Sequence, residues 1–442
     1  MESALKVKII HEENIKPSIP TPQTQNYVKF SFLDQLALPV YVPLLLFYTP
    51  NHNHNPIPSK SHLLKSSLSK TLTLFYPFAG RVNDDNLSIS CTDQGAIYVE
   101  AEASCRLSNI LTQLNVDSLN QLLPFPNASA HANKGCIVLI QTTFFPCGGI
   151  TVGLLISHKI ADASSISSFI KTWTSIAVSG NDSLFPKPEF IGDSVLPAPK
   201  DFPVATPTTP DSGIHAKGVT KRIVFSGSKI ASLKAKAAST KVKQPTRVEA
   251  VAGLLWKSAI SAAKSTSGIS KASVLGQAVN LRKRLEPNLG DTSIGNSLGF
   301  VTPETAVAAE IDLQGTVGLL REAIEEFKES GYKKYQDTEA YLRHFKTLTD
   351  PDGPYSGEKN FYLCSSWSRF QFYEADFGWG LPVWFIGGIS MFSNFFLLMD
   401  TRDGKGIEAL VTLSEEDMAV FQCDQDLLAF ASFNPNVLQL QH

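Results

Sequence analysis

The chain has 442 residues, of which 43% are hydrophobic and 18% charged, a composition typical of a folded globular protein that argues against disorder. Its formal net charge is −2 and it has no block of Lys or Arg, which argues against a nucleic-acid-binding protein, because such a protein needs a basic stripe. We therefore expect a small-molecule partner and enough length for two or three domains.

The amino terminus, the lengths of the apolar runs and the cysteines indicate in which compartment the protein is expected. The amino terminus lacks the apolar core of a signal peptide, and no apolar run reaches the length of about 18 residues that a membrane span requires. We therefore expect a cytoplasmic protein that does not interact with a membrane. The six cysteines have no CxxC spacing, which favours buried free thiols over a metal site or a disulfide framework: Cys91, Cys105, Cys136, Cys147, Cys364 and Cys423.

The first half is expected to mix helices and strands. A histidine-rich stretch at 51–55 could bind a metal in principle, but without further ligands it is better interpreted as a polar loop. The pattern then predicts a helix over about 61–73 that ends at a turn in 76–81. Short strands are expected over 87–91, 96–99 and 135–145.

Residues 150–165 are the most informative segment of the first half. The apolar, β-rich run 150–156 predicts a buried strand, and apolar residues at helical spacing after residue 165 predict a helix with one buried face. His158 therefore lies at a strand end, where a side chain is rigidly held yet can face a cavity. Because neutral imidazole accepts a proton at cellular pH, His158 is a candidate general base. The alternative is a histidine whose ring nitrogens are satisfied locally.

Asp162 follows His158 by four residues and has a structural interpretation. It lies just before the predicted helix, with Ser165 three residues on, so its carboxylate can cap the N–H groups of the first turn. The break from strand to turn between the two residues speaks against a His–Asp relay on one face.

A proline-rich stretch between residues 186 and 210 indicates an extended connector. It divides the chain into an N-terminal domain over 1–190, a linker over 191–217 and a C-terminal domain over 218–442. In the second half Thr246 and Glu249 form a capping-box pattern that starts a helix running to about 263. Further elements are expected as a strand over 274–281, a charged helix over 316–330, and strands over 394–400 and 406–412. The fold class is therefore α/β or α+β.

The second half contains two short glycine-containing motifs. Gly295 to Gly299 fits the G-x-S-x-G elbow of serine hydrolases around Ser297, but no helix pattern follows it, which favours a turn before a strand. The sequence Asp-Phe-Gly-Trp-Gly at 376–380 places two glycines around a tryptophan, typical of a tight backbone excursion that buries a large aromatic ring.

Together, the H-x-x-x-D motif at 158–162 and the D-F-G-W-G motif at 376–380 resemble those of the plant BAHD acyltransferases. The resemblance extends over the whole chain, through the residues at 20–22, 33–35, 75–81, 147–149, 246–249, 279–282, 398–400 and 406–409. Within the family the chain is most similar to the branch that holds vinorine synthase and other alkaloid O-acetyltransferases. Related members acylate terpenoids, sugars and phenolics.

The resemblance implies an α/β fold of two similar-sized, chloramphenicol-acetyltransferase-like domains with a tunnel at their interface. It implies an acyl-CoA-dependent O-acyltransferase that acts as a monomer. Acyl-CoA, in the first place acetyl-CoA, would be the co-substrate, with no bound cofactor or metal. The acceptor would be a hydroxyl of a small plant metabolite, an alkaloid or a terpenoid. Acylation of a sugar or phenolic with a longer acyl-CoA, and a catalytically silent binding protein, are the alternatives.

The resemblance also implies roles for individual residues. His158 would take the proton of the acceptor hydroxyl, and Asp162 would pair with Arg282 away from the substrate. Asp376 would be either a second acid–base group or an ion-paired residue that holds its loop, and the loop role is favoured because Gly378, Trp379 and Gly380 form a packing device. The candidate cations for the CoA phosphates are Arg247, Lys283 and Arg284.

Overall fold

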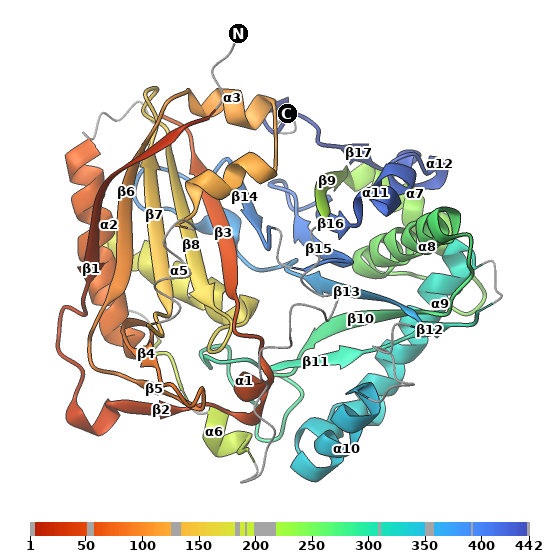
Figure 1. The fold of residues 1–442 in the computed structure, drawn as a ribbon, viewed down its shortest axis with the longest axis horizontal. Helices are drawn as coiled ribbons and strands as arrows, with labels where there is room; N and C mark the ends of the chain where they lie inside the picture. The colour runs from red at the N-terminus through yellow and green to blue at the C-terminus, as the bar shows by residue number, and fades with distance from the viewer. Residues whose placement is uncertain are drawn as a thin grey trace.

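The computed structural model describes residues 5–50, 57–124, 134–181, 186–190, 192–198, 218–307, 311–349, 358–389 and 392–439. These residues form a mixed α/β protein with two main sheets that lie side by side, the first built mainly from the first half of the chain and the second from the second half (Figure 1). The stretch at 51–55, considered above as a loop or metal site, lies outside the described residues.

The first sheet has six strands in the described chain, in the order β1-β6-β7-β8-β3-β14. The strands are β1 (Val7–Ile15), β3 (Tyr41–Tyr48), β6 (Ala96–Ala103), β7 (Val138–Phe144), β8 (Ile150–Ser157) and β14 (Trp384–Gly387). Every residue of β7 and β8 is buried, as expected for central strands without polar alternation. Helices α2 (Ile57–Leu74) and α5 (Ala163–Ser179) pack on this sheet and on each other.

The second sheet follows the order β11-β10-β13-β15-β16-β9-β17, with β12 pairing beside β10. Its strands are β9 (Val219–Phe225), β10 (Ser273–Asn280), β11 (Leu298–Val301), β12 (Glu304–Thr305), β13 (Asn360–Ser366), β15 (Phe395–Asp400), β16 (Ile407–Leu413) and β17 (Ser432–Phe433). One face is covered by helices that share its core, namely α7 (Gly227–Ala237), α8 (Arg247–Ser267), α9 (Leu313–Glu326) and α11 (Glu415–Phe421). The capping box of Thr246 and Glu249 starts α8 as predicted.

Strand β14 links the two halves. It comes late in the chain but pairs antiparallel with β3 of the first sheet, where Trp384 lies opposite Phe47. The large hydrophobic core around the first sheet also takes in Leu397, Met399 and Leu410, on the face of the second sheet that its helices leave uncovered. The core of the first sheet therefore extends onto one face of the second sheet, whose helix-covered face has a separate core.

Shorter elements complete the described fold. A small sheet joins β2 (Tyr27–Lys29), β5 (Ser88–Ser90) and β4 (Arg81–Val82). Short helices and turns connect the rest, as α1 (Phe32–Leu36), η1 (Gln23–Gln25), η2 (Tyr76–Ala79), α3 (Leu107–Thr112), η3 (Asp117–Leu122), α6 (Gly192–Val195), η4 (Phe327–Gly331), η5 (Lys333–Tyr335), α10 (Thr338–Thr349), η6 (Phe372–Glu374) and α12 (Gln425–Leu428).

Several expected elements need correction at their ends. Helix α2 begins four residues earlier than predicted, because Pro58 lies in its first turn, where the missing N–H is tolerated. Strand β6 runs on to Ala103, and the helix expected to end near 330 changes to a π-helical turn at Phe327. The six cysteines are free thiols, but Cys423 is exposed and Cys147 is half-buried, whereas all six were expected to be buried.

Within the described residues, none of the helices is long and apolar enough to cross a bilayer. In the same part of the chain, no group of three or more His, Cys, Asp or Glu side chains is arranged to hold a metal ion.

Candidate active site

His158 directly follows β8 at the end of the first sheet. Its backbone N–H donates to the carbonyl of Val40 (2.8 Å), and the last residue of β8, Ser157, lies opposite Tyr41 of β3. Two neighbouring strands thus fix the backbone of His158, while its side chain is half-buried and so remains accessible. This is the placement predicted from the sequence.

The orientation of the His158 ring is set by Asn296, which lies just before β11. The amide nitrogen of Asn296 donates to the carbonyl of His158 (2.6 Å) and to Oδ1 of Asp34 (2.9 Å). Its amide oxygen is therefore the atom that faces Nδ1 of His158 (3.0 Å), and this oxygen must accept a hydrogen bond from an N–H at that nitrogen. The network assigns the proton to Nδ1 and leaves the lone pair of Nε2 free to act as a base.

Asp34 fixes Asn296 in turn. It is 3% exposed and lies in α1, where it accepts hydrogen bonds from the N–H and hydroxyl of Ser31 (3.1 and 2.7 Å). It also accepts from the backbone N–H of Asn296 (2.6 Å). Burial raises the pKa of Asp34, although the donors of Asn296 and Ser31 oppose that rise. Asp34 is thus a buried acceptor two hydrogen bonds away from the imidazole.

Sequence reasoning did not identify Asp34 or Asn296 as site residues. Signals for both were present: Ser31 and Asp34 have the spacing of a capping box, which α1 contains, and Asn296 lies in the glycine-bounded string 295–299. Gly295 has φ 138°, a backbone conformation that residues with a side chain rarely adopt. The turn that presents Asn296 therefore depends on glycine.

Asp162 and Arg282 form a bidentate ion pair with N–O distances of 2.7 and 3.0 Å. Both side chains are at most 1% exposed. Oδ1 of Asp162 also accepts from the N–H of Ser165 (2.9 Å) and so caps α5, while Oδ2 accepts from the N–H of Ser297 (3.1 Å). Burial opposes the charge, but Arg282 and these donors outweigh it and lower the pKa of Asp162. Asp162 therefore joins α5 to the segment before β11, and its described hydrogen bonds do not include His158.

The glycines of the 376–380 loop are wrapped around Asp376. Its Oδ1 accepts from the N–H groups of Gly378 (2.7 Å) and Gly380 (2.9 Å), both of which have positive φ, at 99° and 108°. The expected ion pair of Asp376 is not found among the described residues. Backbone N–H groups hold this carboxylate instead of a cation, because the two positive-φ glycines turn their N–H groups toward it.

The aromatic residues of this loop are anchored in the core of the first sheet. Phe377 is fully buried, Trp379 is 6% exposed, and their rings stack at 5.5 Å. Tyr48 of β3 packs edge-on against both rings, and its hydroxyl donates to the carbonyl of Ala375 (2.7 Å). The loop thus belongs structurally to the first sheet, next to β14.

The three candidate CoA cations lie near one edge of the second sheet. Strands β10 and β15 both run parallel to β13, so their last residues, Asn280 and Asp400, lie at the same end of the sheet. Arg247 donates to Oδ1 of Asp400 (3.0 Å), while Arg284 donates to the carbonyl of Asn280. Lys283, 70% exposed, pairs with Asp291 (3.2 Å).

Ser297 lies in a turn that leads into β11, and it is 4% exposed. Its N–H donates to Asp162 and its carbonyl accepts from Leu281 (2.8 Å). No helix follows it, so the segment is not a nucleophile elbow.

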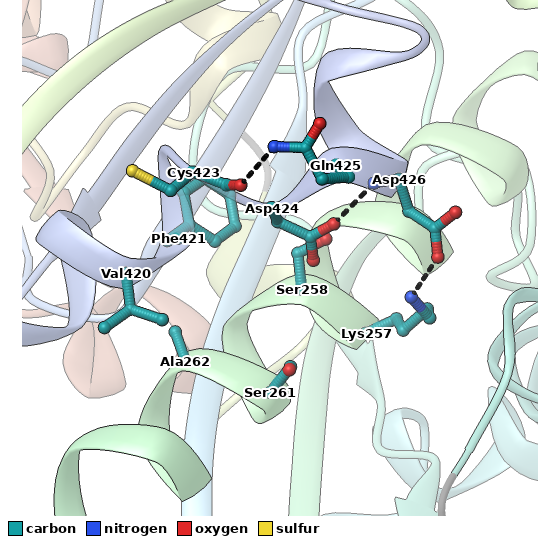
Figure 2. Close-up of a pocket in the computed structure, with 10 residues that line it drawn as sticks. All are labelled: Lys257, Ser258, Ser261, Ala262, Val420, Phe421, Cys423, Asp424, Gln425 and Asp426. Carbon is teal, nitrogen blue, oxygen red and sulfur yellow. Dashed lines mark hydrogen bonds and ion pairs between the residues drawn. The ribbon is translucent and has the colours of Figure 1, made fainter.

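A cavity of about 680 Å³ lies away from these residues, between α8, α11 and α12 (Figure 2). Lys257 and Asp426 form an ion pair at its side, and the exposed Cys423 lies at its rim. None of the predicted site residues lines this cavity.

Comparison with known proteins agrees with this arrangement. The model of the Transferase family matches residues 5–428. A limonoid 7-O-acetyltransferase of Citrus sinensis is 36% identical, covering 98% of this chain and 99% of the relative, and akuammiline synthase 1 of Alstonia scholaris is 38% identical, covering 95% and 96%. The crystal structure of vinorine synthase matches with a TM-score of 0.83 and 32% identity, over 97% of this chain and 99% of that one. The chain therefore belongs to the Transferase family of BAHD-type, acyl-CoA-dependent acyltransferases, as its two motifs predicted.

Proposed function

We propose that this enzyme transfers an acyl group, in the first place acetyl, from acyl-CoA to a hydroxyl of an alkaloid or a terpenoid, with His158 as the general base. One observation carries the mechanism: Asn296 holds the Nδ1 proton of His158, so that Nε2 of a half-buried ring is the basic atom. The relatives named for a limonoid and for akuammiline support the choice of acceptor class.

The reaction needs one proton transfer in each direction. Nε2 of His158 takes the proton of the acceptor hydroxyl as the oxygen attacks the thioester carbonyl. When the tetrahedral intermediate collapses, the C–S bond breaks, and the imidazolium returns the proton to the departing thiolate. The products are an ester and free CoA, with no covalent enzyme intermediate. General-base catalysis contributes roughly 10²–10⁴-fold, and holding both substrates at one place supplies much of the remainder.

Both substrates would meet in a tunnel between domains formed by residues 1–190 and 218–442, with β14 added to the first sheet. Arg247 and Lys283 already have carboxylate partners. Among the described residues Arg284 has no carboxylate partner, and burial lowers the pKa of its guanidinium. Of the three cations, Arg284 is therefore the one whose charge would be most strongly stabilised by binding a CoA phosphate. Asp376 would support the site through its loop and would not transfer a proton.

The variant His158→Ala tests the mechanism. We expect it to bind CoA with unchanged affinity in calorimetry but to lose at least about 10²-fold in turnover, as the loss of a general base requires. The substrates would be a matrix of acyl-CoAs against alkaloid, terpenoid, phenolic and sugar alcohols, with products identified by mass spectrometry. Asn296→Ala should lower kcat as well, because the ring loses its fixed tautomer. Turnover by His158→Ala at the parent rate would contradict the proposal.

A further inference from the structure

Lys159, the residue after His158, is a buried cation that the mechanism does not use. It is 3% exposed, and its ammonium donates to the carbonyls of Gln35 (2.9 Å) and Ala37 (3.2 Å). The ammonium also lies 5.7 Å from the centre of the Phe30 ring. A lysine so deeply buried is costly unless its charge is compensated. The two carbonyls at the end of α1 provide part of that compensation.

The rest comes from Asp34, which lies on the same short helix. The ammonium binds the carbonyl of Gln35, the residue that directly follows Asp34, so the buried carboxylate and the buried ammonium meet the same turn of α1. In agreement with this geometry, burial lowers the pKa of Lys159 to about 8 and the negative charge of Asp34 opposes that fall. Asp162 and Arg282, which also hold the segment that carries Asn296, neutralise each other. Asp193 follows Gly192, which lies against the Asp34 carboxylate, but it is an anion and cannot balance that charge. Lys159 is therefore the cation available to balance the buried carboxylate of Asp34.

We propose that Lys159 is a positioning residue for the reaction, because its buried ammonium keeps Asp34 an anionic acceptor and thereby fixes the amide of Asn296 and the tautomer of His158. The proposal rests on the proposed role of His158 as the base. Lys159 does not touch the substrate. It acts through α1, whose carbonyls it binds and whose carboxylate holds Asn296.

The consequence of losing the ammonium follows from the hydrogen bonds. Without it, the carboxyl of Asp34 retains a proton to higher pH, and a protonated carboxyl is a weaker acceptor for the two N–H groups of Asn296. The carbonyl of His158 is then the one strong acceptor that still holds the amide nitrogen, so the amide can turn in a larger fraction of molecules and present its NH₂ group to Nδ1 of His158. That orientation requires the proton on Nε2, which removes the lone pair that the reaction needs.

Steady-state kinetics of four variants test this chain of contacts: Lys159→Met, Lys159→Arg, Asp34→Asn and the double variant Asp34→Asn/Lys159→Met. We expect Lys159→Met to lower kcat on the order of ten-fold or more, with KM for acyl-CoA within about two-fold of the parent value. The kcat of this variant should recover as pH rises, because the carboxyl of Asp34 then loses its proton. Lys159→Arg, which keeps the charge, should restore part of the rate. The double variant should be no slower than Asp34→Asn alone, because both changes act through one network. Lys70→Met is the control, since Lys70 also donates to a carbonyl, that of Gly180 (2.8 Å), but at the far end of α5.

A second measurement does not depend on turnover. Histidine labelled with ¹⁵N in both ring nitrogens reports the tautomer by NMR, and the His158 signals are assigned from their absence in His158→Gln. We expect the Nδ1–H form in the parent and in Lys70→Met, and a mixed or Nε2–H form in Lys159→Met. The same tautomer in parent and Lys159→Met, or purely additive kinetic effects, would overturn the inference. An inactive His158→Ala beside an unimpaired Lys159→Met would reject the role of Lys159 alone, whereas a fully active His158→Ala would reject the proposed function.

Discussion

Replacing Asp162 with asparagine should destabilise the fold by about 3–5 kcal/mol, the cost of removing one member of a buried ion pair. The variant leaves Arg282 charged and 1% exposed without its carboxylate, while the amide oxygen still caps α5 through Ser165. Asp162→Ala removes the cap as well and should cost roughly 1 kcal/mol more. Both losses are large beside a typical total stability of about 5–15 kcal/mol.

Urea denaturation followed by circular dichroism measures this loss, with Asp426→Asn as the matched control. Asp426 also pairs with lysines, but it is 44% exposed, so its loss should cost no more than about 1 kcal/mol. The pH dependence is a second check. Because the folded state lowers the pKa of Asp162, its contribution is complete above the ordinary value of about 3.9 and disappears only as pH falls through the lower folded value. A deficit under 1 kcal/mol, or one that changes between pH 6 and 9, would refute the reasoning.

Three further variants address the loop and the serine. Asp376→Asn should retain most of the activity in steady-state kinetics, because its amide oxygen can still accept from the N–H groups of Gly378 and Gly380, whereas Asp376→Ala should lose the activity. If both variants were equally inactive, Asp376 would act in acid–base chemistry instead. Tyr48→Phe leaves the carbonyl of Ala375 without its donor and should cost roughly 1–2 kcal/mol in the same denaturation experiment. Ser297→Ala should keep its acyl-transfer rate within about two-fold, and complete loss in that assay would point to a serine nucleophile.

The local parts of the site could be predicted from the sequence because their signals lie within a few residues of one another. The buried strand, the break after His158 and the cap at Asp162 follow from apolar patterning and from capping chemistry, which act over one helical turn or a few strand positions. The pairing of Asp162 with Arg282 required the family resemblance, since no local pattern links those two positions.

The partners of His158 could not be predicted in this way. Asn296 is 138 positions from His158 in the sequence, and Asp34 is 262 positions from Asn296. Nothing local distinguishes a capping aspartate on the surface from one buried beside the active site. Strand β3 is not among the predicted elements. Pro43 interrupts its apolar run, and proline is unusual in a central strand, yet β3 pairs on both sides.

The pairing of β3 with β14 has a consequence for how the protein is made. The contact between Tyr48 and Ala375 joins residues 327 positions apart, so the nascent chain can close the first sheet only when almost all of it has left the ribosome. Until then one edge of β3 stays open beside exposed apolar surface, a state that invites aggregation and chaperone binding. Cutting the gene within the proline-rich stretch should therefore yield no stable half, and two fragments should become soluble only when they are produced together.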